Sequence, residues 1–209
     1  HLIHIKDDLA ANYVVMNDLD CSASSGWNSG NGLEPNGDST TRFTGYIDGA
    51  GHTISNLFMD WPDSYYVGLI GYNSGGEVRD LHFKDIYARG YRYTGSIFGY
   101  STGMPQMRDC GGTGTVISRN RYAGGLIGRN DGGGSDIQNC YFNGTVSGGY
   151  YYIGGLVGWN PGGPIINSTF NGDVSGIYRY IGGLTGYNNN GIWDSHVSGT
   201  VTAGQGYAG

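Results

Sequence analysis

The apolar and glycine positions of the chain follow one recurring phrase, in which two glycines, a leucine, a variable residue and a glycine lie between tyrosine and asparagine. Clear copies are Tyr122–Asn130, Tyr150–Asn160 and Tyr180–Asn188, and looser copies are Tyr65–Asn73 and Tyr93–Ser101. The closing glycines of the five copies are spaced 28, 29, 30 and 28 residues apart: Gly71, Gly99, Gly128, Gly158 and Gly186. A fixed period of this length indicates a stack of equivalent units, so the pattern predicts a solenoid.

Two further apolar positions keep the same spacing after each phrase. The first is Val78, Met107, Ile137, Ile165 and Ile192, and the second is Ile86, Val116, Val146, Val174 and Val201. The apolar runs are short, β-prone and separated by Gly, Asn, Ser and Pro, and no helical period survives the glycines. Each repeat contains three short strands and then returns to the position equivalent to its start. This pattern predicts that one repeat forms one coil of a parallel β-helix, with neighbouring coils about 4.8 Å apart.

We therefore predict an all-β fold, a parallel β-helix of about seven coils with 28–30 residues in each coil. The phrase leucines and their one isoleucine substitute are expected to form one inward column: Leu69, Ile97, Leu126, Leu156 and Leu184. The chain is expected to be a single domain over residues 1–209. Residues 1–65 would form N-terminal coils with a surface loop at 22–41, and residues 66–209 the regular repeats. Tyr207-Ala208-Gly209 matches Tyr122-Ala123-Gly124, so we expect the chain to stop in mid-repeat as part of something longer.

Composition and charge narrow the classes of partner. Glycine is 42 of 209 residues and falls at fixed places, and charged residues are 13%, about half the usual share. The net charge is −6, and the eleven Lys and Arg form no cluster of more than two, so nucleic acid is not expected as a partner. No apolar run approaches the roughly 18 residues of a membrane span, so no span is expected in this chain.

Three parts of the sequence resemble a known family: the run Tyr13–Asp20, the run Phe43–Leu57 and the Gly-Gly-Leu-x-Gly phrases. Together they are similar to the GLUG-motif family of bacterial and archaeal surface proteins, and the similarity covers nearly the whole chain. It departs from the family in the loop 22–41 and in its heavy use of tyrosine. The resemblance implies a right-handed parallel β-helix and a place outside the cell or at its surface. Such repeats occur in large adhesins and in the stalks of IgA-protease-type metallopeptidases, but the resemblance names no reaction.

Tyrosine and arginine recur around each phrase and are the candidate contact residues. In a stack they would form columns of aromatic and guanidinium groups: Tyr65, Tyr91, Arg92, Tyr93, Arg121, Tyr122, Tyr150, Tyr152, Trp159, Tyr178, Arg179 and Tyr180. One interpretation is a stacking ladder, with about 0.5–1 kcal/mol for each exposed Arg–aromatic pair. The other is a contact surface for a surface glycan or a neighbouring protein chain, because Tyr and Arg are enriched where proteins bind. The two interpretations are compatible.

The other candidate residues favour structural roles. Asp80 and Asp109 would stack on adjacent coils about 5 Å apart, as the two carboxyl groups of a retaining glycosidase do. Their column continues as Asn139 and Asn167, which cannot act as acid or base, so we favour hydrogen bonding at a corner. No histidine has metal-ligand spacing, and neither a metal nor another cofactor is expected.

Cysteine gives one structural expectation. Cys110 and Cys140 directly follow matching column residues on adjacent coils, at a separation that permits a disulfide. The alternative is a pair of buried thiols.

These observations leave three functional hypotheses. We favour a non-enzymatic extracellular or cell-surface module, an adhesive or structural stalk that makes contacts through its Tyr/Arg stripe. The second is a subunit of a self-assembling extracellular filament, a homo-polymer of this chain. The third is a polysaccharide-degrading β-helix enzyme, which the carboxylate pair alone supports.

Overall fold

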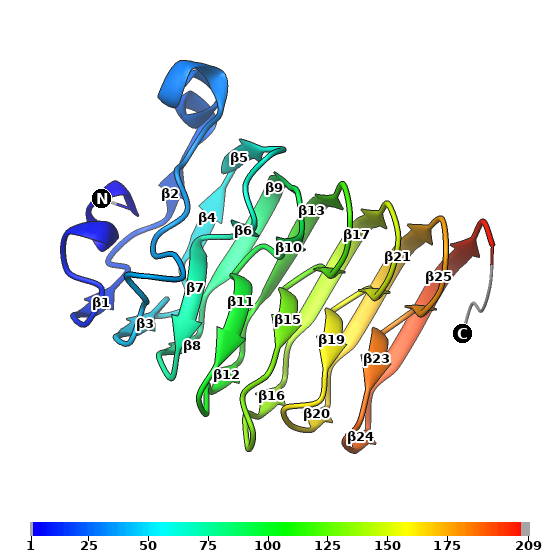
Figure 1. Ribbon diagram of the computed structural model, residues 1–209. Coiled ribbons are helices and arrows are strands. Elements are labelled where there is room, and N and C mark those ends of the chain that lie inside the picture. The colour runs from blue at the N-terminus through cyan, green and yellow to red at the C-terminus, as the bar shows by residue number, and fades with distance from the viewer. Residues whose placement is uncertain (1, 206–209) are drawn as a thin grey trace.

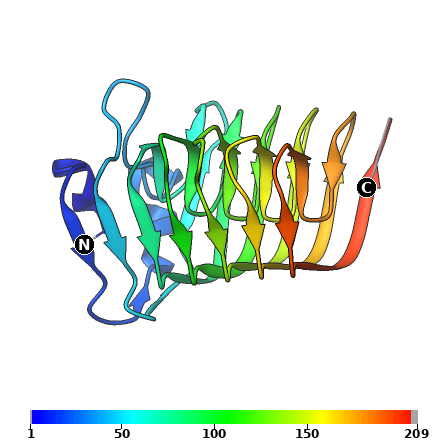
Figure 2. The ribbon, with the colours of Figure 1, turned by 90° about the horizontal axis from the view of Figure 1, so that it is seen from below.

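The computed structural model describes residues 2–205, and its strands stack side by side along one axis (Figure 1). All strand pairs of the named ladders are parallel, and each coil lies against the equivalent part of the next (Figure 2). The all-β, parallel β-solenoid architecture predicted from the repeats is confirmed.

Four sheets run along the stack, which we name A to D. Sheet A contains β1 (Asn12–Val14), β3 (Tyr46–Asp48), β8 (Glu77–Arg79), β12 (Met107–Arg108), β16 (Ile137–Gln138), β20 (Ile165–Ile166) and β24 (Ile192–Trp193). Sheet B contains β2 (Leu19–Asp20), β4 (Thr53–Ser55), β5 (Phe58–Trp61), β9 (His82–Gly90), β13 (Gly111–Ser118), β17 (Tyr141–Gly148), β21 (Thr169–Gly176) and β25 (His196–Ala203).

The two shorter sheets arise from the repeated phrase. Sheet C contains β7 (Ile70–Ser74), β11 (Phe98–Thr102), β15 (Ile127–Asn130), β19 (Val157–Asn160) and β23 (Thr185–Asn188). Sheet D contains β6 (Tyr66–Val67), β10 (Tyr93–Thr94), β14 (Ala123–Gly124), β18 (Ile153–Gly154) and β22 (Ile181–Gly182).

A coil therefore has four strands where the sequence predicted three. The phrase does not form one strand, because it bends between its second glycine and its leucine and so contributes to both sheet D and sheet C. At Gly124 an added Cβ would collide with the carbonyl of Ile127, so only glycine permits this bend. Sheet A has seven strands, but sheets C and D have five, so about five coils are complete and the predicted seven is too many.

Equivalent side chains stack on one another throughout the core. Val116, Val146, Val174 and Val201 are directly paired along sheet B, and Met107, Ile137, Ile165 and Ile192 along sheet A. The predicted column of phrase leucines is buried, with 8% exposure at Leu184 and none at the other four positions. Burying one such side chain contributes about 1.5–3 kcal/mol, so this column is a major part of the hydrophobic core.

The residue that ends each phrase points into the core rather than toward solvent. Within this asparagine ladder, Asn130 Nδ2 donates to Asn160 Oδ1 at 2.8 Å, and Asn160 Nδ2 donates to Asn188 Oδ1 at 2.7 Å. Asn73 Nδ2 donates in the same way to Ser101 Oγ at 3.0 Å. Buried amides need such partners, and here neighbouring coils supply them for Asn73, Asn130 and Asn160.

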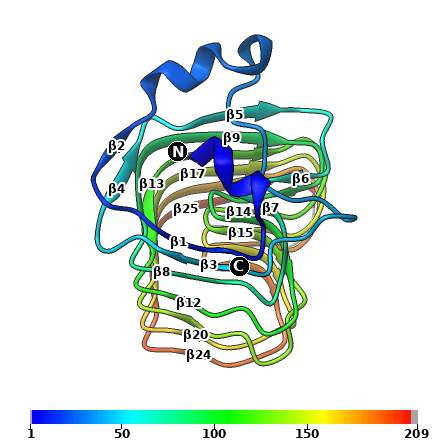
Figure 3. The same ribbon diagram turned by 90° about the vertical axis from the view of Figure 1, so that its left-hand side faces the viewer.

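The N-terminal region is less regular than the coils that follow. It contains three short 3₁₀ helices, η1 (Leu2–Asp7), η2 (Ser22–Gly26) and η3 (Asn28–Gly30), the last two within the segment predicted as a surface loop. Seen along the stack, η1 lies across the end of the coils, and its Ile5 is 3% exposed (Figure 3). An apolar helix side chain thus covers this end of the core.

Candidate functional site

One tyrosine from each complete coil stacks directly on the next along sheet D. This tyrosine column is Tyr66, Tyr93, Tyr122, Tyr152 and Tyr180. Consecutive ring centroids lie 4.9–5.2 Å apart, and consecutive rings are within 16° of parallel. The column is thus a continuous face-to-face ladder, held at the spacing of the coils.

The first member of this column differs from the sequence prediction. The first phrase has one residue fewer between its tyrosines and its leucine, so Tyr66 rather than Tyr65 pairs with Tyr93. Tyr65 is 48% exposed and makes a tilted contact with Tyr91 at 5.5 Å. The missing residue is visible in the sequence, because Gly68 alone separates Val67 from Leu69 where the second copy has Gly95 and Ser96.

Three tyrosines of the column have a backbone conformation that large residues rarely adopt. Tyr122, Tyr152 and Tyr180 have φ of 62°, 64° and 62°. The left-handed region costs an L-residue with a Cβ about 1–2 kcal/mol, and it is unusual for bulky side chains. Strain of this kind persists only where the surroundings hold it, and it is concentrated at functional sites.

A second column, which we name the mixed column, runs beside the first on sheet C. Its members are Tyr72, Tyr100, Arg129, Trp159 and Tyr187. The Arg129 guanidinium carbon lies 5.6 Å from the Tyr100 ring and 5.7 Å from the Trp159 ring, so it fills the place of an aromatic ring. Trp159 and Tyr187 are stacked at 4.0 Å. The two columns meet edge to face, with Tyr152 and Trp159 at 4.5 Å.

A carboxylate holds the arginine of the mixed column in place. Asp131 Oδ2 accepts a hydrogen bond from Arg129 Nε at 2.8 Å and another from the Tyr100 hydroxyl at 2.7 Å. Burial, together with the neighbouring Asp131, raises the pKa of the Tyr100 hydroxyl well above its ordinary value. Asp131 was not among the predicted contact residues, and recognising its pairing with Tyr100 requires the coil register.

The remaining predicted residues form the outer margin of this surface. Arg92, Arg121, Tyr151 and Arg179 precede successive members of the tyrosine column, and outside them lie Tyr91, Tyr150 and Tyr178. Tyr150 and Tyr178 are stacked at 5.1 Å, and Arg121 lies over the Tyr151 ring at 5.2 Å. The structure thus brings together on one surface every tyrosine, arginine and tryptophan that we expected from the sequence. We name this surface, with both columns, the tyrosine face.

The tyrosine face offers solvent particular chemical groups. Tyr93 and Tyr122 are buried, at 9% and 7% exposure, while Tyr150 and Tyr180 are 43% and 42% exposed. The exposure of the rings is therefore uneven across the tyrosine face. Because neighbouring rings cover one another's faces, what remains accessible is ring edges, hydroxyl groups and guanidinium groups. These groups favour polar, hydrogen-bonding contacts.

The corner between sheets A and B carries the column of aspartate and asparagine. We name it the Asx corner: Asp80, Asp109, Asn139, Asn167 and Asp194, with φ between 45° and 55°. Asn139 Nδ2 donates to Asp109 Oδ1 at 2.8 Å, and Asn167 Nδ2 donates to Asn139 Oδ1 at 2.9 Å. These bonds support the structural interpretation of the column, because Asp109 is engaged by its neighbour.

The expected disulfide is not formed in the structure. Cys110 and Cys140 stack on adjacent coils as predicted but are free, buried thiols, as is Cys21. Each of the two thiols instead lies against a main-chain carbonyl, that of Arg108 at 3.1 Å for Cys110 and that of Gln138 at 3.2 Å for Cys140. Burial raises the pKa of the Cys110 thiol well above its usual value, which favours the protonated form.

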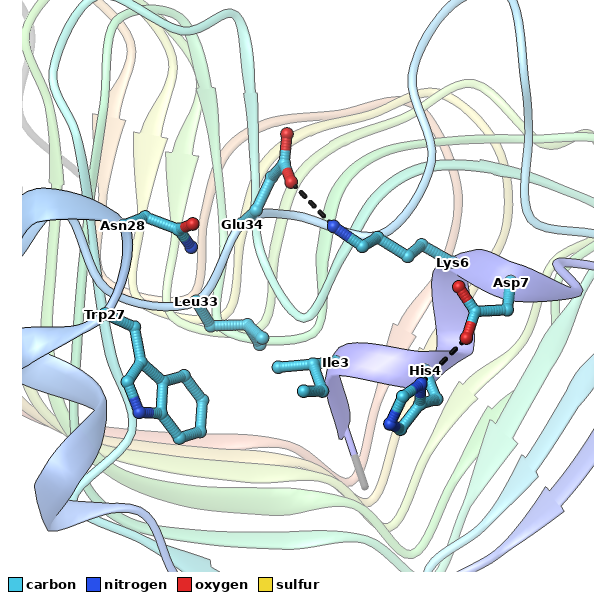
Figure 4. Close-up of a pocket in the computed structure, with 8 residues that line it drawn as sticks. All are labelled: Ile3, His4, Lys6, Asp7, Trp27, Asn28, Leu33 and Glu34. Carbon is cyan, nitrogen blue, oxygen red and sulfur yellow. Dashed lines mark hydrogen bonds and ion pairs between the residues drawn. The ribbon is translucent and has the colours of Figure 1, made fainter.

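A cavity of about 390 Å³ lies between η1 and the η2–η3 segment (Figure 4). Ile3, Trp27 and Leu33 form its apolar side. Its rim carries two ion pairs, Lys6 Nζ to Glu34 Oε2 at 3.0 Å and His4 Nδ1 to Asp7 Oδ2 at 2.8 Å. Its lining residues are not among the contact residues predicted from the sequence.

Residues 2–205 contain no group of three or more His, Cys, Asp or Glu side chains arranged to hold a metal ion. Over the same residues, no helix has the length and apolar character needed to cross a membrane.

Comparisons with known proteins agree with the repeat architecture. The family model described as "The GLUG motif" matches residues 119–147 and 149–175, two adjacent coils, and so confirms the resemblance drawn from the phrases. Halomucin from Haloquadratum walsbyi is 38% identical over 57% of this chain, and a protein described as a Gly-rich membrane protein from Evansella cellulosilytica is 34% identical over 42%. The matched regions are 1% and 10% of those two proteins.

A crystal structure described as an immunoglobulin A1 protease from Bacteroides ovatus has a similar fold, with a TM-score of 0.53. It is 18% identical, and the match covers 99% of this chain and 81% of that one. At this identity the similarity concerns the fold alone.

Proposed function

We propose that this chain, which carries GLUG repeats and resembles surface repeat proteins, is a non-enzymatic module at the cell surface or outside the cell. In this proposal the stacked coils form a stalk, and the tyrosine face is its adhesive surface. The observation that carries the proposal is that every complete coil contributes to that face at the same position. A surface built by repetition along a stalk suits an extended partner, such as a glycan chain or a neighbouring protein.

The energetic cost of the tyrosine face supports a role in contact. The left-handed tyrosines are strained, and two rings within the stack, Tyr65 and Tyr150, keep more than two fifths of their surface in solvent. Exposed aromatic surface repeated over neighbouring coils is typical of interaction sites. A ladder that served stability alone would have no need of the exposed outer rings.

A double variant tests the proposal by removing the outer rings and leaving the inner column. Tyr150→Ser with Tyr178→Ser deletes a stacked pair at the margin. The matched control is Tyr87→Ser with Tyr141→Ser, which deletes two half-buried tyrosines from sheet B. Both variants change the composition equally.

The measurement is retention on immobilised alginate, polygalacturonate, dextran and cellulose, with sedimentation to detect self-association. We expect the marginal variant to lose retention on at least one polysaccharide, or to lose self-association, while its melting temperature stays near that of the control. Loss of self-association alone would favour the filament form of the proposal. Unchanged binding and unchanged self-association would refute a contact role for the face.

A further inference from the structure

The pairing of the basic residues distinguishes the outer margin of the tyrosine face from the rest of the molecule. Six of the eleven Lys and Arg have a carboxylate within 4.0 Å: Lys6, Arg79, Arg89, Arg108, Arg119 and Arg129. Within residues 2–205 the other five have no such ion pair: Arg42, Lys84, Arg92, Arg121 and Arg179. Four of these five belong to the tyrosine face or border it, since Arg42 lies over the Tyr72 ring at 4.9 Å.

This distribution runs against the composition of the chain. Acidic residues outnumber basic ones by 17 to 11, so an arginine placed at random would readily meet a carboxylate. Arg92, Arg121 and Arg179 meet aromatic rings or solvent instead. The Arg92 guanidinium carbon lies 5.0 Å from the Tyr93 ring and 5.6 Å from the Tyr122 ring. These contacts orient the cation without neutralising its charge.

The three arginines occupy one line along the stack. Ser118 Oγ lies within hydrogen-bonding distance of the carbonyls of both Arg92 and Arg121, at 3.1 Å and 2.8 Å, so these two residues lie side by side on adjacent coils. The line continues through Tyr151, whose carbonyl accepts from Tyr122 N at 3.0 Å, to Arg179, whose carbonyl accepts from Tyr152 N at 3.4 Å. Adjacent coils are about 4.8 Å apart, so Arg92 and Arg121 lie one coil apart and Arg121 and Arg179 lie two coils apart.

We infer that the tyrosine face binds an anionic polysaccharide bearing carboxylates, laid along the coils. This inference rests on the proposed contact role of that face and names the chemistry of its partner. Guanidinium groups and phenol hydroxyls are donors, and charge-assisted bonds to carboxylates are the strongest contacts available to them. The stacked rings have their faces covered, so broad face-to-face stacking of neutral sugar rings fits this surface less well. Several carboxylates on one polymer would engage several coils, and the combined binding would exceed that of a single site.

The test uses alginate, a polyuronate, as the probe and dextran as the neutral polymer of similar length. The variant is Arg121→Gln with Arg179→Gln, and the matched control is Arg79→Gln with Arg108→Gln, two arginines of sheet A that have carboxylate partners. Both variants lower the net charge by the same amount. Melting curves of both establish that the coils remain folded.

We expect the first variant to bind alginate about tenfold more weakly, because each exposed ion pair contributes up to about a fivefold change in the dissociation constant. The control is expected to bind within about twofold of the wild type, and salt at roughly 1 M should weaken wild-type binding through screening. Equal losses in the two variants would indicate a response to net charge and would overturn the inference. So would equal binding of alginate and dextran by the wild type.

The same measurements separate this inference from the function on which it rests. If Tyr150→Ser with Tyr178→Ser abolishes attachment while Arg121→Gln with Arg179→Gln binds normally, the face is the contact surface but its ligand is not anionic. That result would overturn the inference alone. If neither variant changes attachment, both the inference and the proposed function are wrong.

Discussion

Three successive coils hold a residue other than glycine in the left-handed backbone region at each of two corners, and the two corners use opposite kinds of residue. At the Asx corner the residue is Asp or Asn, whose short polar side chain tolerates positive φ and bonds locally. At the tyrosine face it is Tyr122, Tyr152 or Tyr180, for which the same conformation is unfavourable. One corner therefore has residues that suit its backbone, and the other has residues that oppose it.

The energies of ring stacking and backbone strain indicate why the two corners differ. An interior tyrosine such as Tyr152 stacks on two neighbours, worth about 0.5–1.5 kcal/mol for each pair, against about 1–2 kcal/mol of backbone strain. The two effects nearly cancel, so stacking alone gives little net advantage over the cheaper Asn. The side chain, rather than the turn, must account for tyrosine at this corner, which agrees with its proposed role in contact.

The variant with the largest expected effect tests whether the Asx corner and the tyrosine face pack against the same hydrophobic core. Leu156 lies just after the bend of the tyrosine face and is fully buried. Leu156→Ala should lower the free energy of unfolding by about 2–5 kcal/mol, because it leaves a cavity between stacked coils. Denaturant unfolding measures this change. A loss below about 1 kcal/mol would show that the phrase leucines are not a shared core.

Replacing one residue at each corner by glycine compares the two corners directly, because glycine adopts a positive φ without strain. Tyr152→Gly should still destabilise the protein by about 2 kcal/mol, because the burial of the ring area is lost in addition to the stacking that offsets the strain. Asn139→Gly should cost about 1 kcal/mol or less, since it loses only hydrogen bonds at the exposed Asx corner. Thermal and denaturant melts of the two variants give the order. The reverse order would mean that the Asx corner holds the coil together.

The smallest expected effect is a difference between the two corners in how they contribute to the pH dependence of the melting temperature. Burial raises the pKa of Tyr66, Tyr93 and Tyr152. A pKa that is higher in the folded state favours the neutral phenol there. The resulting stability is present below the unfolded value of about 10 and is lost as the pH rises through the raised pKa values. The melting temperature should therefore fall in alkaline solution above pH about 10.

Two variants assign this alkaline loss to one corner. The melting temperature of Tyr152→Phe should fall less steeply with rising pH than that of the wild type, because the variant has one phenol fewer to ionise. The melting temperature of Asn139→Gly should fall with pH as steeply as that of the wild type, starting from the variant's own value at neutral pH. Parallel slopes for the wild type and Tyr152→Phe would show that the column does not titrate with unfolding.

Repetition made most of the fold predictable, because like residues at a fixed spacing must stack once the chain forms a solenoid. The buried leucine column and the parallel pairing along sheets A and B follow from that argument. The four-strand coil does not, since the bend depends on close approach of backbone atoms at glycines such as Gly124. The sequence predicts Tyr65 rather than Tyr66 in the column. The first phrase is one residue shorter next to Gly68, and counting back from the leucine does not allow for this difference.

The candidate site was predictable in its residues but not in its geometry. Counting positions before the leucine finds Tyr122, Tyr152 and Tyr180, yet nothing in their type suggests positive φ. The free charge of Arg121 and Arg179 is also invisible in the sequence, because a carboxylate partner can come from any adjacent coil. Matching repeat positions placed Cys110 and Cys140 on adjacent coils, but position alone does not give the state of the two thiols, since neighbours in a ladder need not be bonded.

The asparagine ladder has a consequence for how such a protein changes length over evolutionary time. Asn160 donates one hydrogen bond to the equivalent residue of the next coil and accepts one from that of the previous coil. Duplicating a whole coil by recombination would therefore supply both missing partners at once, whereas an insertion of part of a coil would leave amides unbonded in the core. Gene variants that differ by full repeats should be viable, and variants that differ by fractions of a repeat should be eliminated.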